Sequence, residues 1–151
     1  MTSGSGPPAH RCSGYAPTIL GTPGNDRIRG TEASDIILTR SGRDRIAAGR
    51  GNDIVCAGPG NDDVLGGPGA DDVSAGNHRD AMIGGPGADR LRGAGGWDLI
   101  EARLGSRDTC DGGPPGNDDF PRADVAEGST CETIRSAVVA DRIGRNPARV
   151  R

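Results

Sequence analysis

The chain has 151 residues, with 27 glycines, 11 prolines and a formal net charge of −3. This composition argues against an ordinary packed globule, because Tyr15, Trp97 and Phe120 are the only aromatic residues. A charge this small, with the arginines spread along the chain, does not indicate nucleic-acid binding, and no segment approaches the ~20 apolar residues of a membrane span.

Residues 1–20 form an N-terminal segment that precedes a repeated pattern. Its beginning, MTSGSGPPAHR, has no apolar stretch and is not a secretory signal as it stands. We therefore expect either that a signal has been removed or that the chain leaves the cell without one. The four cysteines lack the close paired spacing of a zinc site, so they predict two disulfides and an oxidising compartment.

Residues 21–101 divide into nine nonapeptides, each with an aspartate in its sixth position. The nine aspartates are Asp26, Asp35, Asp44, Asp53, Asp62, Asp71, Asp80, Asp89 and Asp98. Two positions after each aspartate stands an apolar residue: Ile28, Ile37, Ile46, Val55, Val64, Val73, Met82, Leu91 and Ile100. Two positions before it stands glycine, except in the copies with Ala33 and His78. A turn, an acidic group and one buried side chain in every unit predict a repeat architecture, because a disordered chain needs no period.

Each nonapeptide predicts a turn followed by a short strand. Six residues rich in Gly, Pro, Asn and Asp favour the turn, because glycine adopts positive φ angles at little cost. Three residues such as Asp63-Val64-Leu65 then form a strand, in which alternation points only the middle side chain inward. The core of such a protein is thin, with one large side chain from each repeat.

Copies such as AGPGNDDVL, GGPGADDVS and GGPGADRLR resemble the G-G-x-G-x-D-x-U-x repeat of the RTX (haemolysin-type) calcium-binding family. The resemblance covers slightly more than half of the chain. It implies an all-β fold, a right-handed parallel β-roll or β-solenoid, in which two nonapeptides complete one 18-residue coil. It also implies that each calcium ion lies between two adjacent turns on the same edge of the roll.

The aspartates of such a roll repel one another. Stacked coils place carboxylates ~4.8 Å apart along each edge, where two charges repel by ~0.9 kcal/mol even in bulk water. A divalent cation between successive turns converts this repulsion into attraction, and calcium takes six to eight oxygens from carboxylates and carbonyls. We therefore expect calcium binding to be coupled to folding.

Adjacent turns on one edge are 18 residues apart, so the aspartates divide into two rows. One row is Asp26, Asp44, Asp62, Asp80 and Asp98, and the other is Asp35, Asp53, Asp71 and Asp89. Four gaps in the first row and three in the second allow up to about seven ions. The glycines expected to turn their carbonyls toward these ions are Gly49, Gly51, Gly58, Gly60, Gly67, Gly69, Gly85 and Gly87.

The two rows are not expected to bind equally well. His78 stands where glycine is expected, so its turn must strain or change shape. The turns that end at Asp53, Asp71 and Asp89 keep nearly all of their glycines. We expect the row with these three aspartates to hold calcium most tightly, and the gaps beside Asp80 to fill last.

Four cysteines allow three connectivities, of which we favour Cys12–Cys56 with Cys110–Cys131. The first bond would hold the N-terminal segment as a cap over an exposed sheet edge. The second would close a degenerate coil at the other end of the roll.

Residues 102–134 are predicted to contain degenerate repeats and a C-terminal cap. The register slips after Glu101, and Asp108 and Asp118 follow at ten-residue steps. The run Cys131-Glu132-Thr133-Ile134 resembles the C-terminal cap of short secreted calcium-binding members of the family from actinobacteria. Residues 135–151 are expected to form a weak helix or a loose tail.

Nothing in the sequence predicts an enzyme. The only histidines are His10 and His78, and neither an H-E-x-x-H nor a G-x-S-x-G motif is present. The expectation is a secreted, extracellular, non-catalytic calcium-binding protein, with no partner predicted besides calcium. Two alternatives stay open: a calcium-rigidified adhesion module for a partner or for ice, and a non-catalytic fragment of a larger RTX exoprotein. Ice binding is disfavoured because the second and fifth repeat positions do not form a regular row of Thr and Asn.

Overall fold

The structure, a computed structural model, describes residues 11–101 and 108–113. The expectations for Asp118, for Cys131 and for the tail 135–151 concern residues outside these ranges.

All the regular elements in the described residues are strands. They are β1 (Ile19–Leu20), β2 (Arg27–Arg29), β3 (Ile36–Leu38), β4 (Arg45–Ala47), β5 (Ile54–Cys56), β6 (Asp63–Leu65), β7 (Asp72–Asn77), β8 (Ala81–Ile83), β9 (Arg90–Gly95), β10 (Leu99–Glu101) and β11 (Thr109–Asp111). Most contain the three residues expected from the repeat. β7 and β9 are longer, with six residues each.

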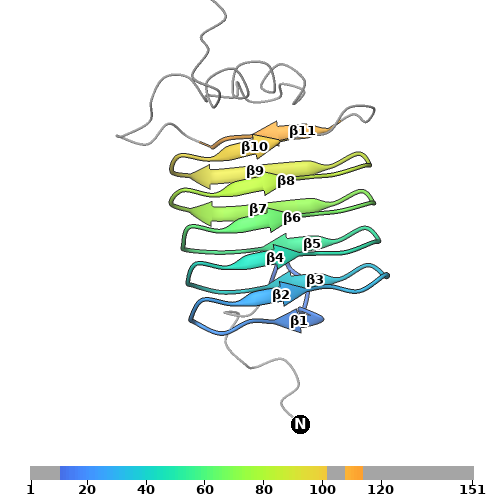
Figure 1. The fold of residues 1–151 in the computed structure, drawn as a ribbon, viewed down its shortest axis with the longest axis horizontal. Coiled ribbons are helices and arrows are strands. Elements are labelled where there is room, and N and C mark those ends of the chain that lie inside the picture. The colour runs from blue at the N-terminus through green and yellow to red at the C-terminus, as the bar shows by residue number, and fades with distance from the viewer. Residues whose placement is uncertain (1–10, 102–107, 114–151) are drawn as a thin grey trace, which may run out of the picture.

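The strands form two parallel β-sheets, and successive coils stack along one axis (Figure 1). One sheet has the order β1-β3-β5-β7-β9-β11, and the other has the order β10-β8-β6-β4-β2. From β1 to β10, paired residues lie 18 positions apart, as Ile28 and Ile46 do and as Ile37 and Val55 do. Two nonapeptides therefore make one coil, and the expected all-β parallel roll is confirmed.

The expected slip after Glu101 is present in the register. Leu91 of β9 pairs with Cys110 of β11, one residue more than the usual 18. The pairing itself continues unbroken, because β11 still adds to the sheet in parallel.

The core lies between the two sheets and receives one large side chain from each strand. The second residue of each strand from β3 to β11 is buried, and these residues pack against one another. Three alanines at the first repeat position, Ala48, Ala57 and Ala75, are fully buried in the same cluster. The sequence pattern had predicted the large side chains of this core, but it had not predicted the alanines.

The N-terminal segment is fastened to the roll by the Cys12–Cys56 disulfide, as expected. Cys12 is fully buried, and Cys56 ends β5. The bond thus links a residue that precedes β1 to the third strand of its sheet. Cys110 is also disulfide-bonded; its expected partner, Cys131, lies outside the described residues.

Candidate metal sites on the two edges of the roll

The aspartates form two rows, one along each edge. Asp26, Asp44, Asp62, Asp80 and Asp98 each stand just before a strand of the five-stranded sheet. Asp35, Asp53, Asp71 and Asp89 stand just before strands of the other sheet. Asp108, which sequence reasoning did not count as a site residue, continues the second row before β11. The rows run where the sequence places them, with one further member.

Backbone hydrogen bonds join neighbouring aspartates in each row. The amide of Asp53 donates to Oδ1 of Asp71 at 2.9 Å, and the amide of Asp71 donates to Oδ1 of Asp89 at 2.9 Å. The same bond links the other neighbours of the two rows at 2.8 to 3.0 Å. Each carboxylate is thereby held by the coil before it, and its position repeats along the edge.

The second carboxylate oxygen has no such donor in the central turns. Oδ2 is buried without a hydrogen-bond partner in Asp44, Asp53, Asp62, Asp71, Asp80 and Asp89. These residues expose at most 2% of their surface. A buried carboxylate oxygen without a donor costs a large part of its hydration energy. Six such atoms in two regular rows therefore indicate that another positive group completes them.

The turns also bring carbonyl oxygens toward the gaps between coils. A Cβ on Gly60 would collide with the carbonyl oxygen of Gly42, one coil earlier, and Gly69 stands in the same relation to Gly51. Gly51 and Gly69 have positive φ angles of 112° and 154°, which a side chain rarely tolerates. Glycine thus permits both the turn conformation and the close approach of an oxygen donor.

The expected site glycines all lie in these turns. Positive φ angles occur at Gly49, Gly51, Gly58, Gly60, Gly67, Gly69, Gly85 and Gly87. For each of them, a Cβ would meet a backbone atom of the turn one coil earlier. Carboxylates and carbonyls are the ligand types that calcium prefers, so the donor set fits this ion.

Side chains alone do not make a metal site here. Within residues 11–101 and 108–113, no three His, Cys, Asp or Glu side chains converge on one point. Carboxylates of a row are separated by a full coil, so a cation between them needs carbonyl oxygens from the turns to fill its coordination. The chemistry favours calcium over zinc, which prefers imidazole and thiolate ligands.

Burial shifts the titration of the central aspartates. It raises the pKa of Asp62 and of Asp71 to about 6, and the pKa of Asp80 to about 7. The amide hydrogen bond lowers each pKa, and the carboxylates of the same row raise it again. The pKa values of Asp53 and Asp89 are raised for the same leading reason. Without a cation, these buried groups are therefore driven toward the neutral form.

Comparison with protein families agrees with this geometry. A family model described as the RTX calcium-binding nonapeptide repeat (4 copies) matches residues 20–55, 39–73 and 74–107, together more than half of the chain. The chain belongs to the RTX calcium-binding repeat family. No curated protein and no solved structure matches it.

The first two turns of this RTX roll differ from the others. Oδ2 of Asp26 accepts a hydrogen bond from the amide of Thr22 at 2.7 Å, and Oδ2 of Asp35 accepts one from the amide of Thr31 at 2.6 Å. Each threonine hydroxyl donates to the same carboxylate at 2.9 Å. Sequence reasoning assigned all nine aspartates one role, although the threonines in GTPGND and GTEASD were a visible signal.

Three later turns adopt positive φ without glycine. Arg40, His78 and Ala94 have φ angles of 83°, 93° and 76°. His78 thus takes the glycine conformation at its position, and this agrees with the expected strain in the turn that ends at Asp80. Its Nδ1 lies 2.7 Å from the carbonyl oxygen of Asn77.

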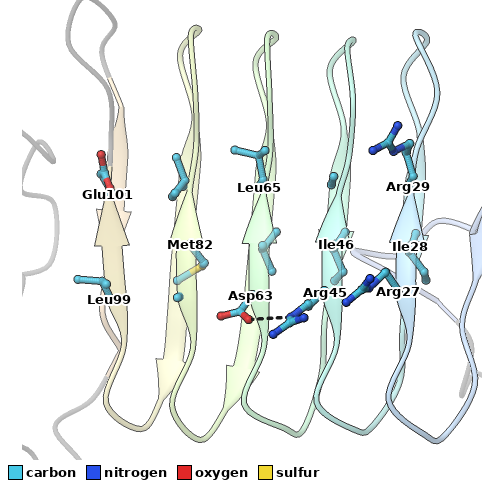
Figure 2. Close-up of a pocket in the computed structure, with 14 residues that line it drawn as sticks. Arg27, Ile28, Arg29, Arg45, Ile46, Asp63, Leu65, Met82, Leu99 and Glu101 are labelled. Carbon is cyan, nitrogen blue, oxygen red and sulfur yellow. Dashed lines mark ion pairs between the residues drawn. The ribbon is translucent and has the colours of Figure 1, made fainter.

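The outer face of the five-stranded sheet carries a shallow depression of about 660 Å³ (Figure 2). Its charged lining includes Arg27 and Arg29 on β2 and Glu101 on β10, with the apolar Leu65 between them. It contains no aspartate of the two rows and neither histidine nor cysteine, so it lies apart from the candidate metal sites. No helix in the described residues is long and apolar enough to cross a membrane.

Proposed function

We propose that this chain is a secreted calcium-binding repeat protein, in which calcium between stacked turns drives or stabilises folding of the roll. The observation that carries the proposal is the set of six buried Oδ2 atoms without donors, arranged in two regular rows. The central aspartates and the glycine-rich turns around them are the proposed ligands. When bound, calcium supplies the positive charge that these carboxylates lack.

The aspartates themselves couple binding to folding. In the unfolded chain each carboxylate is hydrated and separate, whereas folding buries it beside a like charge 18 residues away. Burial of the ionised forms is therefore unfavourable until a cation occupies the gaps, so the binding free energy becomes folding free energy. The aspartate amides of each row donate to Oδ1, and Oδ2 of the central aspartates has no protein donor.

The gaps in the rows set an upper limit on the number of sites. Seven gaps lie between the nine aspartates of the repeats, and Asp108 adds one more gap to the second row. We propose several ions rather than one, with the carboxylates of neighbouring coils sharing them. We propose no catalytic role for the rows, because their carboxylates are assigned to the ions.

The disulfide supports a location outside the cell. Disulfides persist in oxidising compartments and are rare where thiols are kept reduced. Cys12–Cys56 fastens the beginning of the roll, so an oxidising environment favours the folded state. Calcium sites in extracellular modules also bind at the millimolar levels found there.

The test is far-UV circular dichroism against free calcium, with magnesium and chelator as controls. We expect a cooperative gain of β signal with calcium and little with magnesium, which requires a smaller and more regular oxygen cage. A full β signal in chelator, unchanged by calcium, would contradict the proposal.

Two adjacent aspartates provide a matched pair of variants for this titration. Asp62 is buried in a row, whereas Asp63 is exposed and pairs with Arg45 at 3.5 Å. We expect Asp62→Asn to shift the calcium midpoint upward and Asp63→Asn to leave it nearly unchanged. Equal shifts would show that general charge, and not the row, governs the response.

A further inference from the structure

The second position of the repeat has two conformations in this roll. In the turn that ends at Asp44 and in every later turn of the repeats, this residue has positive φ: Arg40, Gly49, Gly58, Gly67, Gly76, Gly85 and Ala94. The first two turns instead have Thr22 and Thr31, which are not among the described residues with positive φ. A β-branched residue is strongly disfavoured there, so threonine selects the other conformation.

The conformation decides where the second-position amide points. In three later turns it donates to a carbonyl one coil onward: Gly49 to Gly66 at 3.1 Å, Gly58 to Ala75 at 2.8 Å and Gly67 to Gly84 at 2.8 Å. In the first turns it points inward and donates to Oδ2 of the turn's own aspartate. The oxygen that is left without a donor in the central turns is thus satisfied in the first two.

The threonine hydroxyls supply a second missing donor. Oδ1 of a central aspartate accepts the amide of the aspartate one coil earlier. Asp26 opens its row, so no earlier aspartate amide exists for it, and the Thr22 hydroxyl donates to its Oδ1 instead. For Asp35 the hydroxyl of Thr18 takes this place at 3.3 Å.

Each threonine also closes its turn. The amide of Gly24 donates to Oγ1 of Thr22 at 3.2 Å, and the amide of Ala33 donates to Oγ1 of Thr31 at 3.1 Å. One side chain therefore organises both the turn backbone and the carboxylate. The hydrogen bonds that each threonine donates to the carboxylate are stronger than neutral ones, because the acceptor is charged.

We infer that Thr22 and Thr31 replace calcium at the first turn of each edge, so that the N-terminal end of the roll forms without metal. The inference rests on the proposed function, because it assigns calcium dependence to the coils that follow. The Cys12–Cys56 disulfide holds β1, β3 and β5 of the same end together. Calcium then extends order from this end, since each coil of a solenoid is stabilised by its neighbours.

The first experiment is amide hydrogen exchange on the whole chain, in calcium-free buffer and in calcium. Without calcium we expect protected amides in Thr22–Cys56 and fast exchange in later coils, and with calcium we expect protection in both. Uniform exchange along the roll without calcium would overturn the inference.

Two double variants separate the threonines from the disulfide, which both retain. Thr22→Val with Thr31→Val keeps β-branching and removes the hydroxyls, and we expect first-coil protection without calcium to fall about tenfold or more. Thr22→Gly with Thr31→Gly permits positive φ, and we expect first-coil protection to become calcium-dependent. Ser41→Ala is the control, because the hydroxyl of Ser41 contacts the carbonyl of Pro23 and no aspartate.

The outcomes distinguish this inference from the proposed function. If calcium orders the later coils but both threonine variants behave as the wild type, the threonine role is wrong and calcium-coupled folding stands. If calcium changes exchange in no coil, the proposed function fails, and with it the assignment of Thr22 and Thr31 as substitutes for the ion.

Discussion

The backbone amide of Asp53 donates a 2.9 Å hydrogen bond to Oδ1 of Asp71, which follows it by 18 residues. The bond crosses from one coil to the next, so it fixes the spacing of the two carboxylates. It satisfies one oxygen of Asp71 and leaves the other buried without a donor. The row therefore holds each carboxylate by one oxygen, and the other oxygen needs a cation to offset its buried negative charge.

The two rows should differ in calcium affinity. We expect Asp71→Asn to lower the apparent affinity by about 10- to 100-fold, on the scale of losses seen when metal-site residues are altered. We expect a smaller loss from Asp80→Asn, because the non-glycine residue His78 adopts φ 93° in its turn. Calcium titration by calorimetry measures both.

Asp72→Asn is the control for this comparison, since Asp72 lies beside Asp71 in sequence but pairs with Arg92 at 2.6 Å. Equal losses for Asp71→Asn and Asp80→Asn would contradict the ranking of the rows.

Low pH should stabilise the calcium-free roll, because protonation removes the repulsion that calcium otherwise offsets. The folded pKa values of Asp62 and Asp71 are about 6, above the ordinary 3.8. A group with a raised folded pKa stabilises the fold below its unfolded pKa and loses that contribution as pH rises through the folded value. In calcium-free buffer we therefore expect a higher melting temperature at pH 4.5 than at pH 8, by thermal circular dichroism.

Calcium should reverse this pH dependence, because calcium binds the ionised carboxylates and releases protons. The calcium midpoint should accordingly rise as the pH falls from 8 to 5. A calcium-free protein that is less stable at pH 4.5 than at pH 8 would refute the assignment of these pKa shifts to burial.

Replacing His78 by glycine should stabilise the folded roll. His78→Gly removes a side chain held at φ 93°, and we expect a gain of about 1 kcal/mol in unfolding free energy in calcium. Gly51→Ala should have the opposite effect, because its φ is 112° and a Cβ would stand 2.6 Å from the carbonyl carbon of Ala33. Urea denaturation with both variants checks the sign, and a loss with His78→Gly would show that its contact with Asn77 outweighs the strain.

The disulfide should stabilise the roll whether or not calcium is present. Cys12→Ser with Cys56→Ser opens a loop of 44 residues, and the chain-entropy argument gives a loss of about 4 kcal/mol. Guanidinium denaturation in saturating calcium measures this loss. A much smaller loss would mean that the segment around Cys12 remains packed without the bond.

The regular part of this structure could be predicted because one physical rule repeats in it. An inward apolar residue two positions after each aspartate sets the strand, so Ile46 and Val64 lie in the core as expected. The lengths of β7 and β9 could not be predicted from the period. Both strands run on into the turn, where Gly76 pairs with Ala94 and Asn77 pairs with Gly95.

The candidate site was predictable in outline and not in detail. Spacing placed the aspartates on two edges, but it did not distinguish Asp26 and Asp35 from the others. That difference depends on hydrogen bonds from Thr22 and Thr31, which come from the backbone conformation of single turns. Asp108 was obscured by one inserted residue, although its amide partner Asp89 shows that the row continues.

Because each nonapeptide is half of a coil, the segment between Cys12 and Cys56 can gain or lose nonapeptides only in pairs if the disulfide is to form. Cys12, which precedes β1, reaches Cys56 on β5, a strand of the same sheet as β1. A single nonapeptide inserted between them would carry Cys56 to the opposite sheet and separate the two sulfurs by the width of the core. Two nonapeptides would return it to the correct side, one coil further away. Beyond Cys56, odd insertions meet no such barrier, so the C-terminal half of the roll is free to vary in length while the N-terminal half is not.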